Sequence, residues 1–366
     1  MTKMNELADL GQAVWLDYIR RSFTRSSELR ALVKQGLRGV TSNPSIFQEA
    51  IAKSSDYDDA LQPLIEKGHY VDVIYEKLIL EDIQDAADIL EPVYDRTSGA
   101  DGFVSLEVNP ALAYDAKSTI VDARRLWSAI ERPNVMIKVP ATDQGIAALR
   151  QLISEGINVN ATLIFSLTHY ERIVNAYITG LEDRAAAGGD LSEVASVASF
   201  FVSRVDTKAD AALEEIGNEE LQGKIAIANS KVAYDHFRDV LASQRWQSLA
   251  DRGARPQRVL WASTSTKNPR YPDTLYVDEL IGGDTVNTMP RDTLEAFLDH
   301  GTVEVTVTEG VDEAREQLER LTELGIDLEA LTEDLQNEGV DAFAKSYRGL
   351  LSCLSDKVKE SRKPSC

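Results

Sequence analysis

Short apolar runs alternate with longer amphipathic segments along most of the chain. The runs are rich in Val and Ile and are bounded by Gly, Asn or Pro, as β-strands are. The segments between them repeat apolar residues every three or four positions, as in Ile79, Ile83, Ala87 and Leu90, which predicts helices. The predicted strands are residues 13–17, 39–43, 103–108, 135–139, 158–165, 196–202, 258–263 and 284–288.

Eight strands alternating with helices favour a (β/α)8 TIM barrel. A doubly wound sheet is disfavoured because no glycine-rich dinucleotide or P-loop fingerprint follows the early strands. Residues 224–243 contain the apolar run IAIA, a possible ninth strand. We predict a helix there, because apolar positions continue beyond the run with mixed charge and no break.

The pattern after residue 290 is helical only, with an apolar stripe that runs from Val340 to Leu354. We therefore expect a catalytic barrel over residues 1–300 and additional C-terminal helices, packed on the barrel, over residues 301–366. The last residues, KESRKPSC, are expected to form a frayed tail. The sequence leaves open whether the extension covers the bottom or the flank of the barrel, or contacts another subunit. Either a monomer or a homodimer is compatible with the sequence.

Composition and charge narrow the class of partner. The 366 residues include 39 basic and 60 acidic side chains, a formal net charge of −21. Nucleic acid and anionic membranes both require cationic surface, so neither is expected as a partner. No apolar run is long enough to span a bilayer and no leader stands at the N-terminus, which makes the cytoplasm the expected location.

The cysteines and histidines indicate neither a metal site nor a cofactor. Cys353 and Cys366 match no disulfide framework or metal-ligand spacing, and the four histidines are scattered. Cys353 falls within the C-terminal apolar stripe, so we expect it to be a small buried side chain rather than a redox group.

One lysine stands inside an apolar stretch, NVMIKVPAT at residues 134–142. A charge in a dry environment costs several kcal/mol unless it is paired or loses its proton. A surface strand that points Lys138 to water would be the simple explanation. Similarly, Asp17 and Glu107 could be solvated strand ends, and Asn43 before Pro44 could start a helix.

The ends of different barrel strands meet at one face, where such enzymes carry their chemistry. Two acids, a lysine, amides and hydroxyls converging there favour a functional site over separate structural roles. The residues that alternation places on the interior side of strand ends are Asp17, Asn43, Glu107, Lys138, Asn160, Thr162 and Ser263.

This set of side chains suits Schiff-base chemistry. A desolvated lysine loses its proton more readily, and the neutral amine can attack a ketone. The iminium that forms withdraws electrons, so a neighbouring carbon–carbon bond can break. Iminium formation expels water, which calls for a carboxylate and an ordered water, and bond cleavage needs a second carboxylate as base. We therefore predict Lys138 as a Schiff-base nucleophile.

At these positions the sequence resembles the transaldolases. The matching motifs, in chain order, are GVTSNPSIF (39–47), SLEVNP (105–110), MIKVPAT (136–142), NATLIFS (160–166) and SFFVSRVD (199–206). Two later segments, LWASTSTKNP (260–269) and YVDEL…DTVNTMP (276–290), resemble the longer bacterial form of the family. The resemblance implies a class I aldolase barrel, without a metal, that transfers a dihydroxyacetone unit between sugar phosphates of the pentose phosphate pathway.

The resemblance also implies roles for individual residues. Lys138 would be the nucleophile, Asp17 the acid/base on the C4 hydroxyl, and Glu107 a proton shuttle through a water held with Thr162. The dihydroxyacetone hydroxyls would be held by Asn43, Asn160 and Ser199. Arg204 and Ser263 would bind the phosphate.

Two positions depart from relatives of the chain. In the commoner form of the family an arginine follows the serine equivalent to Ser263 by two positions; here Ser265 stands there. We expect Lys267 to supply the missing positive charge, although an exposed loop lysine is the alternative. Much shorter relatives that act as fructose 6-phosphate aldolases carry tyrosine where Phe201 stands, and an apolar Phe favours transfer over release of dihydroxyacetone.

Three alternatives differ in what they predict. An aldolase of the same mechanism would release dihydroxyacetone without an acceptor. A sugar-phosphate-binding protein without catalysis would form no reducible adduct. A metal-dependent aldolase would lose activity to a chelator, and the scattered histidines disfavour it.

Overall fold

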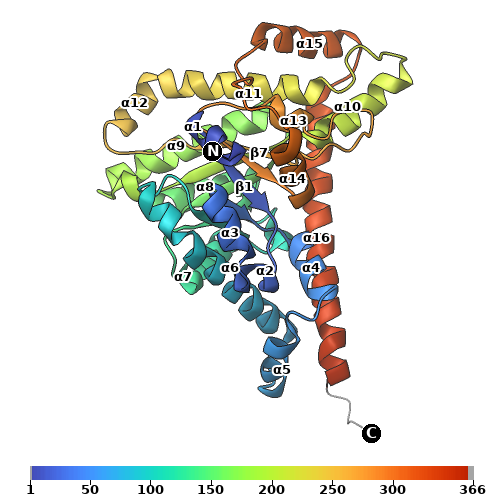
Figure 1. The fold of residues 1–366 in the computed structure, drawn as a ribbon. Coiled ribbons are helices and arrows are strands. Elements are labelled where there is room, and N and C mark those ends of the chain that lie inside the picture. Colours follow the sequence, from blue (N-terminus) through green and yellow to red (C-terminus); the bar gives the residue numbers. More distant parts are fainter. Residues whose placement is uncertain (1, 362–366) are drawn as a thin grey trace.

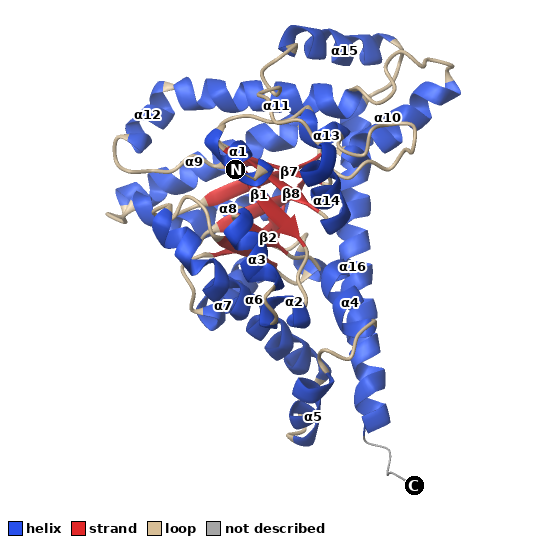
Figure 2. Cartoon of the chain, in the orientation of Figure 1, coloured by secondary structure: helices blue, strands red, loops and turns tan. Residues whose placement is uncertain are grey.

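The computed structural model describes residues 2–361 and contains a closed barrel of parallel strands in the order β1 to β8 (Figure 2). The (β/α)8 fold and all eight predicted strands are confirmed. The strands are β1 (Gln12–Asp17), β2 (Gly39–Thr41), β3 (Phe103–Glu107), β4 (Val135–Pro140), β5 (Val159–Ile164), β6 (Ser196–Phe201), β7 (Arg258–Ala262) and β8 (Thr285–Met289).

Helices follow the strands and surround the barrel (Figure 1). The first half contains α1 (Lys3–Asp9), α2 (Arg21–Arg25), α3 (Glu28–Gln35), α4 (Pro44–Ala52), α5 (Asp58–Glu66), α6 (Val71–Arg96), η1 (Pro110–Leu112), α7 (Ala116–Ile130) and α8 (Asp143–Ser154). The second half contains α9 (Leu167–Ala186), η2 (Leu191–Glu193), α10 (Ser203–Glu215), α11 (Ile225–Ala242), α12 (Gln244–Ala250), α13 (Leu275–Asp278), α14 (Arg291–His300), α15 (Val311–Glu323) and α16 (Leu328–Ser361). The helix predicted over residues 224–243 is α11, so that prediction is confirmed.

Side chains fill the interior of the barrel. Trp15 on β1 is fully buried, and β2 begins with Gly39 directly beside it. A Cβ atom at Gly39 would lie 2.5 Å from the indole ring of Trp15, so only glycine fits this register. The interior of the barrel is therefore filled at this point, and the chemistry is left to the carboxyl ends of the strands.

The long helix α16 crosses the carboxyl ends of β4 and β5. Gln336 donates its side-chain N–H groups to the carbonyl oxygens of Ala141 and Leu163, both at 3.0 Å. Leu163 has a φ of 60°, at a point where the pairing of β5 with β6 shifts register. The helix also packs on α4 and α6 at the flank of the barrel (Figure 1).

The position of α16 decides between the bottom and the flank of the barrel, while contact with another subunit stays a prediction. The helix covers the flank and the carboxyl-terminal face, not the bottom of the barrel. Cys353 on this helix is partly exposed, so the expectation that it is buried is wrong; the helix turns it away from the interior. Residues 359–361, assigned to the frayed tail, continue α16, and the rest of that tail lies outside the described residues. The division at residue 300 stays a prediction.

None of the helices within residues 2–361 combines the length and apolar character that a membrane span requires.

Candidate active site

The Lys138 side chain enters the barrel at the carboxyl end of β4 and is 5% exposed. Its Nζ donates to the carbonyl oxygen of Ser42 at 3.0 Å and lies 3.8 Å from Oε2 of Glu107. The ring of Phe343, from α16, lies 5.9 Å from the same Nζ. The lysine is therefore a buried interior residue, and the alternative of a surface strand is wrong.

The Glu107 carboxylate is buried at the end of β3, directly across from Lys138 in the strand register. Within residues 2–361 neither of its oxygens has a hydrogen-bond partner. Burial raises the pKa of Glu107 to about 7, against the opposing effect of the Lys138 ammonium, and the Asp17 charge raises it further. Such a carboxyl group can both give and take a proton near neutral pH.

Asp17 ends β1 and accepts a hydrogen bond from the Thr41 hydroxyl at 2.7 Å. The Thr41 hydroxyl in turn lies 2.7 Å from that of Thr288 on β8. Burial raises the pKa of Asp17, whereas Lys138, the Thr41 hydrogen bond and Arg204 lower it. The two acids and the lysine thus come from three different strands.

Amide and hydroxyl groups form one chain across β3, β5 and β6. Ser199 donates to the Asn160 Oδ1 at 2.7 Å, and the Asn160 amide donates to the Ser105 hydroxyl at 3.1 Å. Among the described residues the buried Thr162 hydroxyl has no hydrogen-bond partner. Asn43 caps α4 by accepting from the Ile46 N–H at 3.0 Å, so its helix-starting role is real and is combined with a place beside Lys138.

Two cations lie at the other end of the site. Arg204, in the first turn of α10, places its guanidinium 5.5 Å from the Phe201 ring. Lys267 donates to the Ser265 hydroxyl at 2.6 Å. Burial and the nearby Arg204 charge both lower the pKa of Lys267. The Ser263 hydroxyl, 3.1 Å from that of Ser203, completes this region. Two close cations beside hydroxyls are suited to binding a phosphate.

These groups line a cavity of about 180 Å³. Of the predicted site residues, the cavity brings together Asp17, Asn43, Lys138, Thr162, Ser199, Arg204, Ser263 and Lys267. Asn160 lies behind Ser199, fully buried, and Glu107 borders a different cavity.

The lining residues that were missed from the sequence include Thr41, Thr288 and Phe343. The first two end strands inside the quoted motifs, and that position could have identified them. The only sequence signal for Phe343 was its position in an apolar helical stripe, and such a stripe is typical of any packed helix. Among the described residues, no group of three or more His, Cys, Asp or Glu side chains is arranged to hold a metal ion.

The fold and the cavity define a (β/α)8-barrel enzyme with a buried lysine between two carboxylates at the carboxyl ends of its strands. The chain belongs to the transaldolase/fructose-6-phosphate aldolase family, whose model matches residues 14–354. A transaldolase of Trichodesmium erythraeum is 45% identical over 97% of this chain and 97% of its own. Transaldolases of Parafrankia sp. and Thermobifida fusca are each 48% identical, over 97% of this chain and 98% of theirs.

These relatives confirm the family that the motifs indicated and the enzyme class, a transferase of the transaldolase type. The similarity extends over nearly the full length, C-terminal helices included.

Proposed function

We propose that this protein transfers a dihydroxyacetone unit from fructose 6-phosphate or sedoheptulose 7-phosphate to glyceraldehyde 3-phosphate or erythrose 4-phosphate. The reaction belongs to the non-oxidative pentose phosphate pathway, and we place it in the cytoplasm, in a monomer or homodimer. The observation that carries the proposal is the buried Lys138 amine beside Glu107 and in one cavity with Asp17.

Lys138 attacks the ketone carbon of the donor sugar. Glu107, with its pKa near neutrality, protonates the leaving hydroxyl of the carbinolamine, and Thr162 holds the water that exchanges protons with it. Asp17 then removes the proton from the C4 hydroxyl as the bond between C3 and C4 breaks. The same carboxyl returns this proton when the acceptor aldehyde binds.

The remaining residues orient the sugar. Asn43, Asn160 and Ser199 hold the dihydroxyacetone hydroxyls through neutral groups, which leave the two acids free to move protons. Arg204 and Ser263 bind the phosphate, and Lys267 replaces the arginine found in the commoner form of the family. The close approach of Arg204 and Lys267, whose charges repel, supports an anion between them.

Phe201 favours transfer over release. Its ring packs 5.0 Å from the Phe165 ring and is 7% exposed at the wall of the cavity. A phenylalanine has no hydroxyl group that could activate a water molecule to attack the iminium carbon. The competing function, an aldolase that releases dihydroxyacetone, predicts equal turnover of fructose 6-phosphate with and without an acceptor.

Borohydride reduction in the presence of fructose 6-phosphate tests the proposal. Intact mass and peptide mapping should find one adduct, on Lys138. Lys231 is an internal control, because it is 8% exposed but paired with Glu279 at 3.0 Å. Lys138→Met should abolish the adduct and Lys231→Met should keep it. No adduct on the unmodified protein would overturn the proposal.

A further inference from the structure

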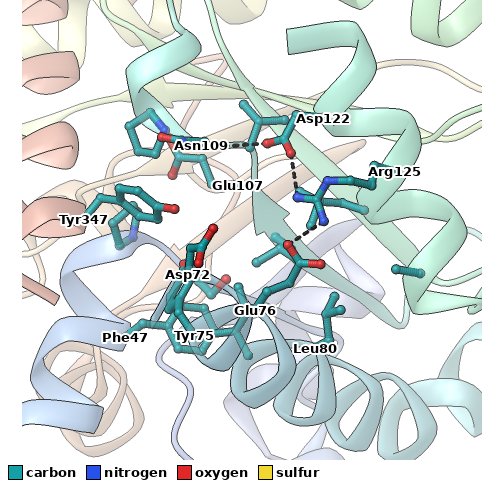
Figure 3. A pocket seen from close by; sticks show the side chains of 18 of the residues that line it. Phe47, Asp72, Tyr75, Glu76, Leu80, Glu107, Asn109, Asp122, Arg125 and Tyr347 are labelled. Atoms are coloured by element: carbon teal, nitrogen blue, oxygen red, sulfur yellow. Dashed lines mark hydrogen bonds and ion pairs between the residues drawn. The ribbon is translucent and has the colours of Figure 1, made fainter. Parts of the chain in front are cut away.

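A second and larger cavity lies beside the site. It has a volume of about 570 Å³ and is enclosed by the end of β3, by α6 and α7, and by Tyr347 of α16 (Figure 3). Exposed residues line its outer part, among them Asp72, Lys77 and Ala129, so it opens to solvent. In the view of Figure 3, Glu107 and Asn109 lie at one end of this cavity and Leu80 at the other.

Glu107 forms the boundary between the two cavities. It lines the second cavity, and its carboxylate lies 3.8 Å from the Lys138 amine, which lines the first. Asn43 lines both. Both carboxylate oxygens of Glu107 are buried and have no hydrogen-bond partner within residues 2–361, so each can still accept a hydrogen bond from a water.

Water is a product of the chemistry at this boundary. The neutral Lys138 amine adds to the ketone, and a proton moves from nitrogen to oxygen to give the carbinolamine. Glu107 then donates its proton to the hydroxyl, the carbon–oxygen bond breaks, and the nitrogen lone pair forms the C=N bond. Amine, ketone and carboxylic acid thus give iminium, water and carboxylate. The reverse reaction consumes one water.

Under the proposed function, substrate fills the first cavity when this water is released. A sugar phosphate occupies the space between Lys138 and the Arg204–Lys267 end, and Phe343 covers the lysine from α16. The second cavity has room for several waters, and polar side chains stand among the apolar ones that line it. Arg125 there pairs with Glu76 and with Asp122, at 2.7 Å from the latter, and the Tyr347 hydroxyl and the Asp72 carboxylate add further polar groups (Figure 3).

We infer that the second cavity is the route by which water and protons reach and leave Glu107 during iminium formation, separately from the entrance used by the sugar phosphates. The inference rests on the proposed function, since it requires the Schiff base on Lys138. It assigns a role in the reaction to Asp72 and Tyr347, which line the second cavity and not the first.

The test follows the oxygen atom that is expelled. Fructose 6-phosphate labelled with ¹⁸O at C2 loses its label to solvent when the released water escapes, and keeps it when that water returns to the iminium. Val73 and Leu80 line the cavity from α6, and Val73 is 37% exposed, which makes Val73→Trp compatible with folding. Val73→Trp and Leu80→Trp each narrow the route. Val121→Trp is the matched control, because Val121 on α7 is 62% exposed and outside the cavity.

We expect label loss per iminium formed to fall several-fold in both narrowing variants, with an unchanged KM for fructose 6-phosphate and a lower kcat. Val121→Trp should match the unmodified protein. Iminium is quantified in each sample by borohydride trapping. If both narrowing variants form the normal amount of trapped iminium and lose the ¹⁸O label as fast as the unmodified protein, this inference is overturned but the proposed function is not. Failure of trapping in the unmodified protein would overturn the proposed function, and this inference with it.

Discussion

The Nζ atom of Lys138 lies 3.8 Å from Oε2 of Glu107, because the two residues face each other across the paired strands β3 and β4. The distance is too long for a hydrogen bond and short enough for a strong electrostatic interaction in a buried site. A proton can therefore pass between the acid and the amine through a water or sugar hydroxyl that lies between them.

The two acids should act at different steps. Glu107→Gln should slow iminium formation, whereas Asp17→Asn should leave it intact and slow carbon–carbon cleavage, each by about 10²- to 10⁴-fold, as expected for loss of a general acid or base. Borohydride trapping at short times should therefore find less adduct in the first variant and abundant adduct in the second. Equal trapping in both would contradict the division of roles.

The stability of the protein should depend on pH through Glu107. Its pKa in the folded protein is about 7, above the ordinary value of 4.5, so the folded state binds a proton that the unfolded state has lost between these values. The contribution of Glu107 to the stability of the folded protein is therefore fully present below pH 4.5 and is lost as the pH rises through 7. The free energy of unfolding should fall by about 3 kcal/mol over this window from this group.

Urea unfolding at pH 5 and pH 8 measures this effect as the difference between the unmodified protein and Glu107→Gln. Asp206, another buried acid with a pKa of about 7, is present in both proteins and cancels in the comparison. An identical pH dependence in the two proteins would show that Glu107 has an ordinary pKa.

Phe343 should help to retain the iminium. Phe343→Ala removes the ring that covers Lys138 and admits water, so release of free dihydroxyacetone relative to transfer should rise several-fold. Leu350→Ala is the control, because Leu350 is buried on the same helix and does not line the cavity. Both variants should lose about 2–5 kcal/mol of stability, typical of large-to-small substitutions in a core. If Phe343→Ala and Leu350→Ala show the same ratio of dihydroxyacetone release to transfer, Phe343 has no specific role in retaining the iminium.

Lys267 should act on the phosphate. Lys267→Ala removes the charged hydrogen bond that Lys267 would donate to the substrate phosphate, worth about 1.5–3 kcal/mol. KM for fructose 6-phosphate should therefore rise about tenfold or more. Turnover of unphosphorylated fructose should change little, and Lys267→Arg should retain affinity. Lys345→Ala, at an exposed position of α16 outside the cavity, is the control. An equal effect on both sugars would place Lys267 outside the phosphate site.

Much of the site follows from alternation along single strands. Period-two alternation places Asp17, Glu107 and Lys138 on the inner face of their strands, and a closed parallel barrel brings the carboxyl ends of those strands together. The fold could be predicted because each strand and helix has a local signal that agrees with the others. The two cations proposed to bind phosphate were found through the quoted motifs and not through periodicity.

The tertiary structure alone decided what surrounds these groups. The sequence determined the barrel, its lysine and its two acids, because these depend on patterns a few residues long. It did not determine that α16, some 200 residues beyond Lys138, covers that lysine with Phe343, or that Glu107 divides two cavities. An apolar helical stripe shows that a helix packs somewhere. The surface on which it packs depends on shape and on partners such as the Ala141 and Leu163 carbonyls, which only the folded barrel presents to Gln336.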